Sequence, residues 1–194
     1  MKRKFISISV LVGLSLLILT GCVAGPTAQS APGVSANETS VYVSYQQYVY
    51  KIDAKSGAET WRFPASGSAS TVFYAPPLVI DGNVYVGDFN KNFHNVADST
   101  GQEIWVFTQA QGWYQTAPQV DGDLIFVPNT DRNVYALKAD GTLSWKYSDQ
   151  YGFLAQPVIV GETVVIGSQN HEIIALTKTT GQEIWKHQMK GAVV

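Results

Sequence analysis

The residues that could carry out chemistry are few and scattered. His94, His171 and His187 lie at unequal places in the chain, with no HxxxH pattern and no Cys/His cluster around them. Zinc sites draw several such ligands from short, characteristic spacings. The chain also lacks the G-x-S-x-G motif that presents a nucleophilic serine. We therefore expect no catalytic residues and no zinc-type metal site.

The segment DFNKNFHNVADS comes nearest to a calcium-binding loop. Asp88, Asn90 and Asn92 stand at the first three ligand positions of such a loop. However, Phe93 replaces the glycine that the loop requires, and Ser99 stands where a bidentate glutamate is needed. Because other parts of the chain place a polar turn at the matching point, we interpret the segment as a hairpin turn without a metal.

The elements that must position any site come from an internal repeat. The hexapeptide TGQEIW occurs at 100–105 and again at 180–185. Four tryptophans, each four residues after a glycine, are spaced 44, 40 and 40 residues apart. The pairs are Gly57 and Trp61, Gly101 and Trp105, Gly141 and Trp145, and Gly181 and Trp185. Such regularity over a period of about 40 residues indicates a repeat architecture.

Each repeat reads as about four short strands. Runs such as Val84-Tyr85-Val86 are β-branched or aromatic and are bounded by turn-forming residues. The apolar runs are nearly continuous, which suits sheets covered on both faces. We therefore predict an all-β fold, a β-propeller with four-stranded blades of about 40 residues. The recurring tryptophans are interpreted as fillers between neighbouring blades, and not as an active site.

The repeat resembles that of the pyrroloquinoline-quinone-like (PQQ-like) propellers, which runs approximately Ala-x-Asp-x-x-Thr-Gly-x-x-x-Trp. Residues 175–185 follow it with Thr177 in place of the Asp, and Asp53 in the first unit keeps that acid. The resemblance covers about 40–194 and implies seven or eight blades in a complete ring. Family members include quinone dehydrogenases and non-catalytic scaffolds. With one cysteine and no acidic cluster of the calcium-cage type, we expect neither PQQ nor calcium here.

The first 40 residues predict export and a lipid anchor. A basic start, MKRK, precedes an apolar run of 14 residues that suits a secretory signal. It ends in LTGC, which resembles the lipobox of bacterial lipoproteins, with Cys22 as the acylated residue. We assign 1–21 to the signal peptide and 22–39 to the acylated cysteine and a flexible tether. The protein is then anchored to the cell membrane or the outer membrane.

The rest of the chain is assigned to propeller repeats at about 40–65, 70–109, 110–149 and 150–189, with a further blade starting at 190–194. The first unit is expected to lack the strand that opens the later ones, so the propeller is expected to be incomplete. The whole chain has a formal net charge of −2, and charged residues make up 14% of it. No basic footprint suggests nucleic acid.

A variable aromatic segment lies between each tryptophan strand and the proline of the following unit. Equivalent loops of a propeller collect on one face, so we predict an interaction face from four aromatic residues, Trp113, Tyr114, Tyr74 and Tyr151. Phe73 and Phe153 are equally well explained as plugs of the central channel.

The favoured function is a non-catalytic scaffold that binds other envelope proteins, since lipobox and repeats together resemble the BamB-like lipoprotein propellers of outer-membrane protein assembly. The alternatives are a small-molecule or glycan-binding surface protein and part of a PQQ-dependent dehydrogenase.

Overall fold

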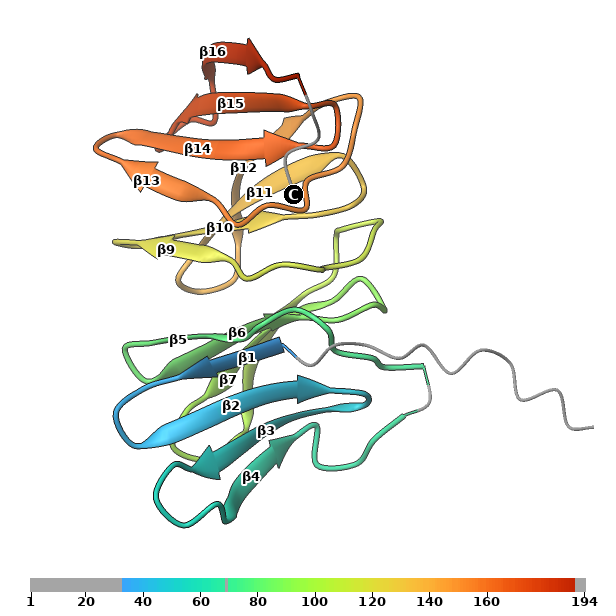
Figure 1. Cartoon of the computed structure of the whole chain (residues 1–194), viewed down its shortest axis with the longest axis vertical. Coiled ribbons are helices and arrows are strands. Elements are labelled where there is room, and N and C mark those ends of the chain that lie inside the picture. The colour runs from blue at the N-terminus through green and yellow to red at the C-terminus, as the bar shows by residue number, and fades with distance from the viewer. Residues whose placement is uncertain (1–32, 69, 191–194) are drawn as a thin grey trace, which may run out of the picture.

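The computed structural model describes residues 33–68 and 70–190 (Figure 1). Within these ranges the chain forms sixteen β-strands and no helix. The strands make four separate four-stranded antiparallel sheets, each built from four strands consecutive in sequence. The predicted all-β propeller fold is confirmed, here as four blades. No helix long and apolar enough to span a membrane occurs among the described residues.

The four blades follow one another along the chain. Blade 1 contains β1 (Gly33–Ala36), β2 (Ser40–Tyr45), β3 (Tyr48–Asp53) and β4 (Glu59–Phe63). Blade 2 contains β5 (Leu78–Ile80), β6 (Asn83–Gly87), β7 (Phe93–Ala97) and β8 (Glu103–Phe107). Blade 3 contains β9 (Gln119–Asp121), β10 (Leu124–Pro128), β11 (Asn133–Lys138) and β12 (Leu143–Ser148). Blade 4 contains β13 (Val158–Val160), β14 (Thr163–Ser168), β15 (Glu172–Thr177) and β16 (Glu183–Gln188).

The hydrophobic core lies between successive blades. One cluster joins blades 1 and 2, a second joins blades 2 and 3, and a third joins blades 3 and 4. The two middle strands of blades 2 and 3 therefore bury both of their faces, as in β10, where four successive residues are buried. This explains why the apolar runs in the sequence do not alternate with polar residues.

The repeated Gly–Trp pairs link one blade to the next. The Trp61 ring lies against Gly101 of blade 2, and its Nε1 donates a hydrogen bond to the Asp98 carbonyl oxygen at 2.8 Å. Trp105 and Trp145 make the same contact with the turns of blades 3 and 4, again through Nε1 to a backbone carbonyl. Trp185, on the last described strand, is 46% exposed.

One prediction about blade 1 is wrong, because its opening strand is present. Residues 33–36, which we had assigned to the tether, form β1 and pair with β2, placing Val34 opposite Val43. The segment contains a single large apolar residue and follows a stretch rich in small residues, so no strand pattern is visible in the sequence. The predicted signal peptide, Cys22, the tether up to residue 32 and residues 191–194 lie outside the described residues.

Candidate functional site

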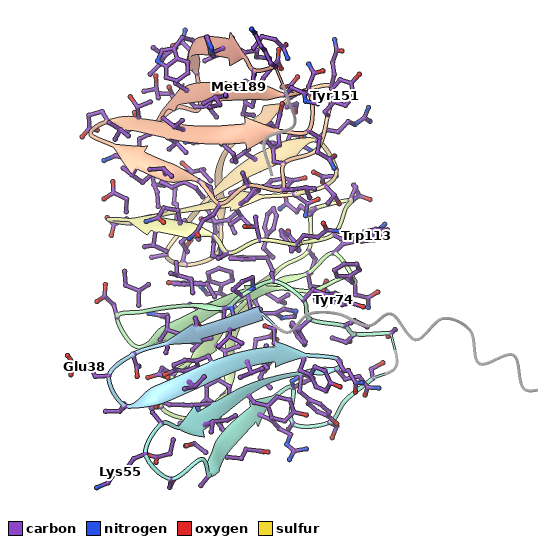
Figure 2. All side chains as sticks on the ribbon, in the orientation of Figure 1. Glu38, Lys55, Tyr74, Trp113, Tyr151 and Met189 are labelled. Carbon is purple, nitrogen blue, oxygen red and sulfur yellow. The ribbon has the colours of Figure 1, made fainter. Side chains whose placement is uncertain are left out.

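One face of the four-blade arc collects the loops predicted to bind partners. The β2–β3, β6–β7, β10–β11 and β14–β15 turns lie along one edge in Figure 1. Tyr74, Trp113 and Tyr151 lie on this same side, whereas Glu38 and Lys55 lie on the opposite one (Figure 2). We call the first side the aromatic face, defined by these turns and by residues 71–74, 111–115 and 151–154.

Trp113 is the most prominent side chain of the aromatic face. It is 48% exposed, and its ring stacks on Phe89 with centroids 5.1 Å apart and planes inclined by 16°. Phe89 in turn packs against Tyr74 at 4.2 Å. Phe89 was not predicted, because it lies within a polar turn segment. These three rings form a continuous aromatic row from the β4–β5 connection, over the β6–β7 turn, to the β8–β9 connection.

The backbone around Trp113 is held by the next turn. Its amide donates to Thr130 Oγ1 at 2.7 Å, and its carbonyl accepts from the Thr130 amide at 3.2 Å. Asp131 Oδ2 accepts from the Gln111 amide at 2.7 Å and from the Tyr135 hydroxyl at 2.6 Å. The indole is therefore presented from a fixed position, which lowers the conformational entropy lost on binding.

A cleft of about 610 Å³ opens beside Trp113. Its walls come from three blades and include Lys91, Gln115, Asp131, Leu154 and Gln169. Clefts of this size, with one aromatic wall and a few polar groups, are typical of ligand or peptide sites. The arrangement can offer a stacking surface, amide hydrogen bonds and one cation.

Tyr114 does not belong to the exposed face, and its prediction as an interaction residue is wrong. It is 1% exposed and packs against Phe93 with centroids 5.5 Å apart. Its side chain covers Gly87, where a Cβ would collide with it. Burial raises the pKa of the Tyr114 hydroxyl well above its usual value. Consecutive residues alternate in direction in extended backbone, so Trp113 points outward while Tyr114 points inward.

The other predicted aromatic residues divide in the same way. Tyr151 is 46% exposed, and Tyr74 is half-buried in the aromatic row. Phe73 and Phe153 are fully buried between blades and bridge to the ends of β6 and β14. Among the loop aromatic residues of this face, Tyr74, Phe89, Trp113 and Tyr151 are therefore the ones that remain accessible.

A second cluster, which the sequence did not reveal, surrounds His94. Its Nδ1 lies 2.6 Å from Glu103 Oε1 and its Nε2 lies 3.3 Å from Asp88 Oδ2. Burial lowers the pKa of His94, but the hydrogen bonds to Asp88 and Glu103 outweigh this and leave the pKa raised. Both ring nitrogens therefore face carboxylates, and the imidazolium form is favoured.

The His94 cluster borders a cleft of about 250 Å³ lined also by Phe63, Thr71 and Phe73. Asp88, the first residue of the calcium-like segment, accepts the Asn92 amide at 2.7 Å and so caps the β6–β7 turn. Across the described ranges, no group of three or more histidine, cysteine, aspartate or glutamate residues is arranged to hold a metal ion.

Comparison with known sequences points to one family. The family model described as outer membrane protein assembly factor BamB matches residues 23–109 and 45–193. The chain is 25% identical over 112 residues to outer membrane protein assembly factor BamB of Burkholderia pseudomallei, covering 58% of this chain and 29% of that protein. The chain is 24% identical over 176 residues to the same factor from Moranella endobia, covering 90% of this chain and 35% of that protein.

A tetrathionate hydrolase of Acidithiobacillus ferrooxidans is 26% identical over 166 residues, covering 84% of this chain and 29% of that protein. The chain thus spans about a third of the length of the curated relatives it matches.

Solved structures show the same fold at low sequence identity. BamB from Moraxella catarrhalis superposes with a TM-score of 0.69 at 18% identity, over 80% of this chain and 48% of that one. The computationally designed protein Ika8 superposes with a TM-score of 0.72 at 18% identity, over 83% of this chain and 50% of that one. The quinohemoprotein alcohol dehydrogenase from Comamonas testosteroni superposes with a TM-score of 0.69 at 16% identity, over 80% of this chain and 34% of that one.

Proposed function

Because the chain belongs to the family of outer membrane protein assembly factor BamB, we propose that it is a lipid-anchored envelope scaffold that takes part in outer-membrane protein assembly. The relatives named for this process support the role, and the aromatic face supplies a surface for it. The observation that carries the proposal is the exposed, backbone-fixed indole of Trp113. Rigid, half-exposed tryptophans beside a cleft are typical of protein-binding hot spots.

A non-catalytic role is supported by the state of the His94 cluster. Within the described part of the chain this cluster most resembles a catalytic arrangement, since it combines an imidazole with two carboxylates. However, both ring nitrogens are engaged by Asp88 and Glu103. With both ring nitrogens directed at carboxylates, His94 has no free lone pair with which to act as a general base. We therefore interpret the cluster as a link between the β6–β7 turn and β8.

The lipid anchor would hold the propeller at the membrane where assembly takes place. The supporting observations are the basic start, the apolar run and the Cys22 motif in the sequence. Multiple acyl chains on one residue give stable anchoring, whereas a single chain is marginal. β1 begins at Gly33 beside the Tyr74 backbone, so the chain enters blade 1 close to the aromatic face.

The proposal is tested by deleting the gene in the organism that carries it and measuring folded outer-membrane β-barrel proteins by electrophoresis of unheated samples. We expect these folded forms to decrease, and the wild-type gene to restore them. A Cys22→Ser gene, whose product cannot be acylated, should restore them poorly. Unchanged amounts of folded barrel proteins after deletion would contradict the proposed function.

A further inference from the structure

The tips of four equivalent hairpin turns have an unusual backbone conformation. Gln46, Lys91, Arg132 and His171 have φ values of 51°, 71°, 74° and 61°, one in each blade. This left-handed region favours glycine and, among other residues, asparagine. Three of the four tips nevertheless carry a basic side chain. A costly backbone position occupied repeatedly by one chemical type points to a role for the side chain.

The three basic tip side chains are exposed and make no ion pair with the residues that the structure describes. They also make no side-chain hydrogen bond within 33–68 and 70–190. Lysines elsewhere in the molecule do pair, as Lys51 does with Asp98 at 2.7 Å and Lys178 with Asp121 at 2.6 Å. Lys91 and Arg132 therefore present positive charges that the fold itself does not use.

The acidic residues near these tips are engaged by other groups of the fold. Asp88 is 1% exposed and caps its own turn. Asp131 accepts the Tyr135 hydroxyl, and the Asp149 and Glu172 carboxylates lie 3.3 and 3.6 Å from the Lys186 ammonium group. Asp131 also lines the cleft, but both of its carboxylate oxygens accept hydrogen bonds from neighbouring residues, whereas Lys91 and Arg132 are exposed and unpaired among the described residues.

The cleft beside the tips is suited to a peptide. Lys91 and Trp113 line it together with two exposed glutamines, Gln115 and Gln169. The side chains of these glutamines form no hydrogen bond with other described residues, so their amides can donate to and accept from a peptide backbone. A concave cleft with amide walls accommodates an extended segment, whereas a lipid surface would require a flat or protruding one.

We propose that the aromatic face binds an extended acidic peptide segment of a partner protein, with Trp113 stacking on an apolar side chain and with Lys91 and Arg132 facing carboxylates. This inference rests on the proposed scaffold function and specifies the chemistry of its partner. Because the tip charges lie in successive blades, they would align a segment across the arc and accelerate its association.

The test measures peptide binding to the purified full chain by fluorescence anisotropy. Two labelled peptides of about twelve residues are compared, one alternating Phe with Glu and the other alternating Phe with Lys. We expect the acidic peptide to bind at least about tenfold more tightly than the basic one. Its affinity should fall as the salt concentration rises from about 0.05 M to about 0.5 M, since exposed charges are screened.

The decisive variant is Lys91→Asn combined with Arg132→Asn. Asparagine tolerates the left-handed conformation better than either basic residue, so the melting temperature should be unchanged or higher. Binding of the acidic peptide should nevertheless weaken about tenfold or more. The matched control is Lys55→Asn on the opposite face (Figure 2), which should leave the affinity unchanged. If the double variant melts at a lower temperature, each single variant is measured in its place.

Equal affinity for both peptides, or undiminished binding by a folded Asn variant, would overturn the inference. Binding to vesicles containing phosphatidylglycerol without binding to the acidic peptide would also overturn it, in favour of a lipid surface. None of these three results would change the phenotype expected on deletion of the gene. Failure of this inference and failure of the proposed function are therefore distinguishable.

Discussion

The Trp61 indole lies on the α-carbon of Gly101 in the next blade, while its Nε1 donates to the Asp98 carbonyl oxygen at 2.8 Å. A Cβ on Gly101 would lie 2.8 Å from the Trp61 ring, so this contact requires glycine. Gly101 also has a φ of +71°. In the pairs of blades 2 and 3 the two residues therefore serve different interfaces: the glycine receives the tryptophan of the preceding blade, and the tryptophan packs on the glycine of the following one.

We expect Gly101→Ala to destabilise the fold more than Gly57→Ala. Both glycines have positive φ, but nothing lies within 4 Å of a Cβ on Gly57. Gly57→Ala should cost only about 1 kcal/mol of unfolding free energy for the backbone. Gly101→Ala adds overpacking against Trp61, typically about 1–3 kcal/mol. Urea unfolding of both variants measures the difference, and equal losses would contradict the assigned contact.

Trp145 and Trp185 should differ in the same way in this 194-residue chain. Trp145 is 9% exposed and packs beneath the Gly181 turn, whereas Trp185 is 46% exposed. Trp145→Ala should lower the unfolding free energy by about 3–5 kcal/mol. Trp185→Ala should cost clearly less, because its ring has fewer partners. Thermal unfolding compares them, and a larger loss for Trp185→Ala would refute the blade-to-blade packing.

Neighbouring residues Trp113 and Tyr114 should give opposite results. Tyr114→Ala opens a cavity beside Phe93 and should cost about 3–5 kcal/mol of stability. Trp113→Ala removes an exposed ring and should change the melting temperature little while weakening partner binding. Tyr114→Phe is the matched control, since the Tyr114 hydroxyl is buried and has no hydrogen-bond partner among the described residues. Removing the hydroxyl in Tyr114→Phe should leave the unfolding free energy unchanged or raise it slightly. A strongly destabilised Trp113→Ala variant would assign Trp113 to the core.

Stability should depend on pH through His94. Its pKa in the folded protein is raised above the ordinary 6.5, so the protonated form stabilises the fold. This contribution is fully present below about pH 6.5 and is lost as the pH rises through the folded-state pKa. The stability difference between wild type and His94→Gln, measured by urea unfolding from about pH 6 to about pH 9, should therefore shrink as pH rises. A difference that is constant with pH would show that His94 is not held as an imidazolium.

Much of the fold could be predicted because the sequence repeats its strongest local signals. The Gly–Trp pairs and the turn glycines mark the hairpins directly, and the continuous apolar runs match sheets buried on both faces. β1 could not be predicted, because pairing with β2 forms a strand from residues with little intrinsic strand pattern.

The candidate site was only partly predictable for a similar reason. Trp113 was predicted as part of an interaction face, and its side chain is exposed in the structure. Phe89 joins the aromatic row only through a contact between two blades, and the His94 cluster forms only when three separate segments meet. The inward direction of Tyr114 depends on its packing over Gly87 and against Phe93, which the sequence pattern does not reveal.

The most direct test of the central claim compares crosslinking from the two faces in living cells. A photoreactive amino acid is placed at Trp113, or at Lys55 on the opposite face, in the full-length chain. After irradiation, the crosslinked proteins are identified by mass spectrometry. We predict that position 113 crosslinks to proteins of outer-membrane assembly and that position 55 does not. Equal adducts from both positions, or adducts at position 55 alone, would contradict the assignment of the aromatic face as the partner-binding surface.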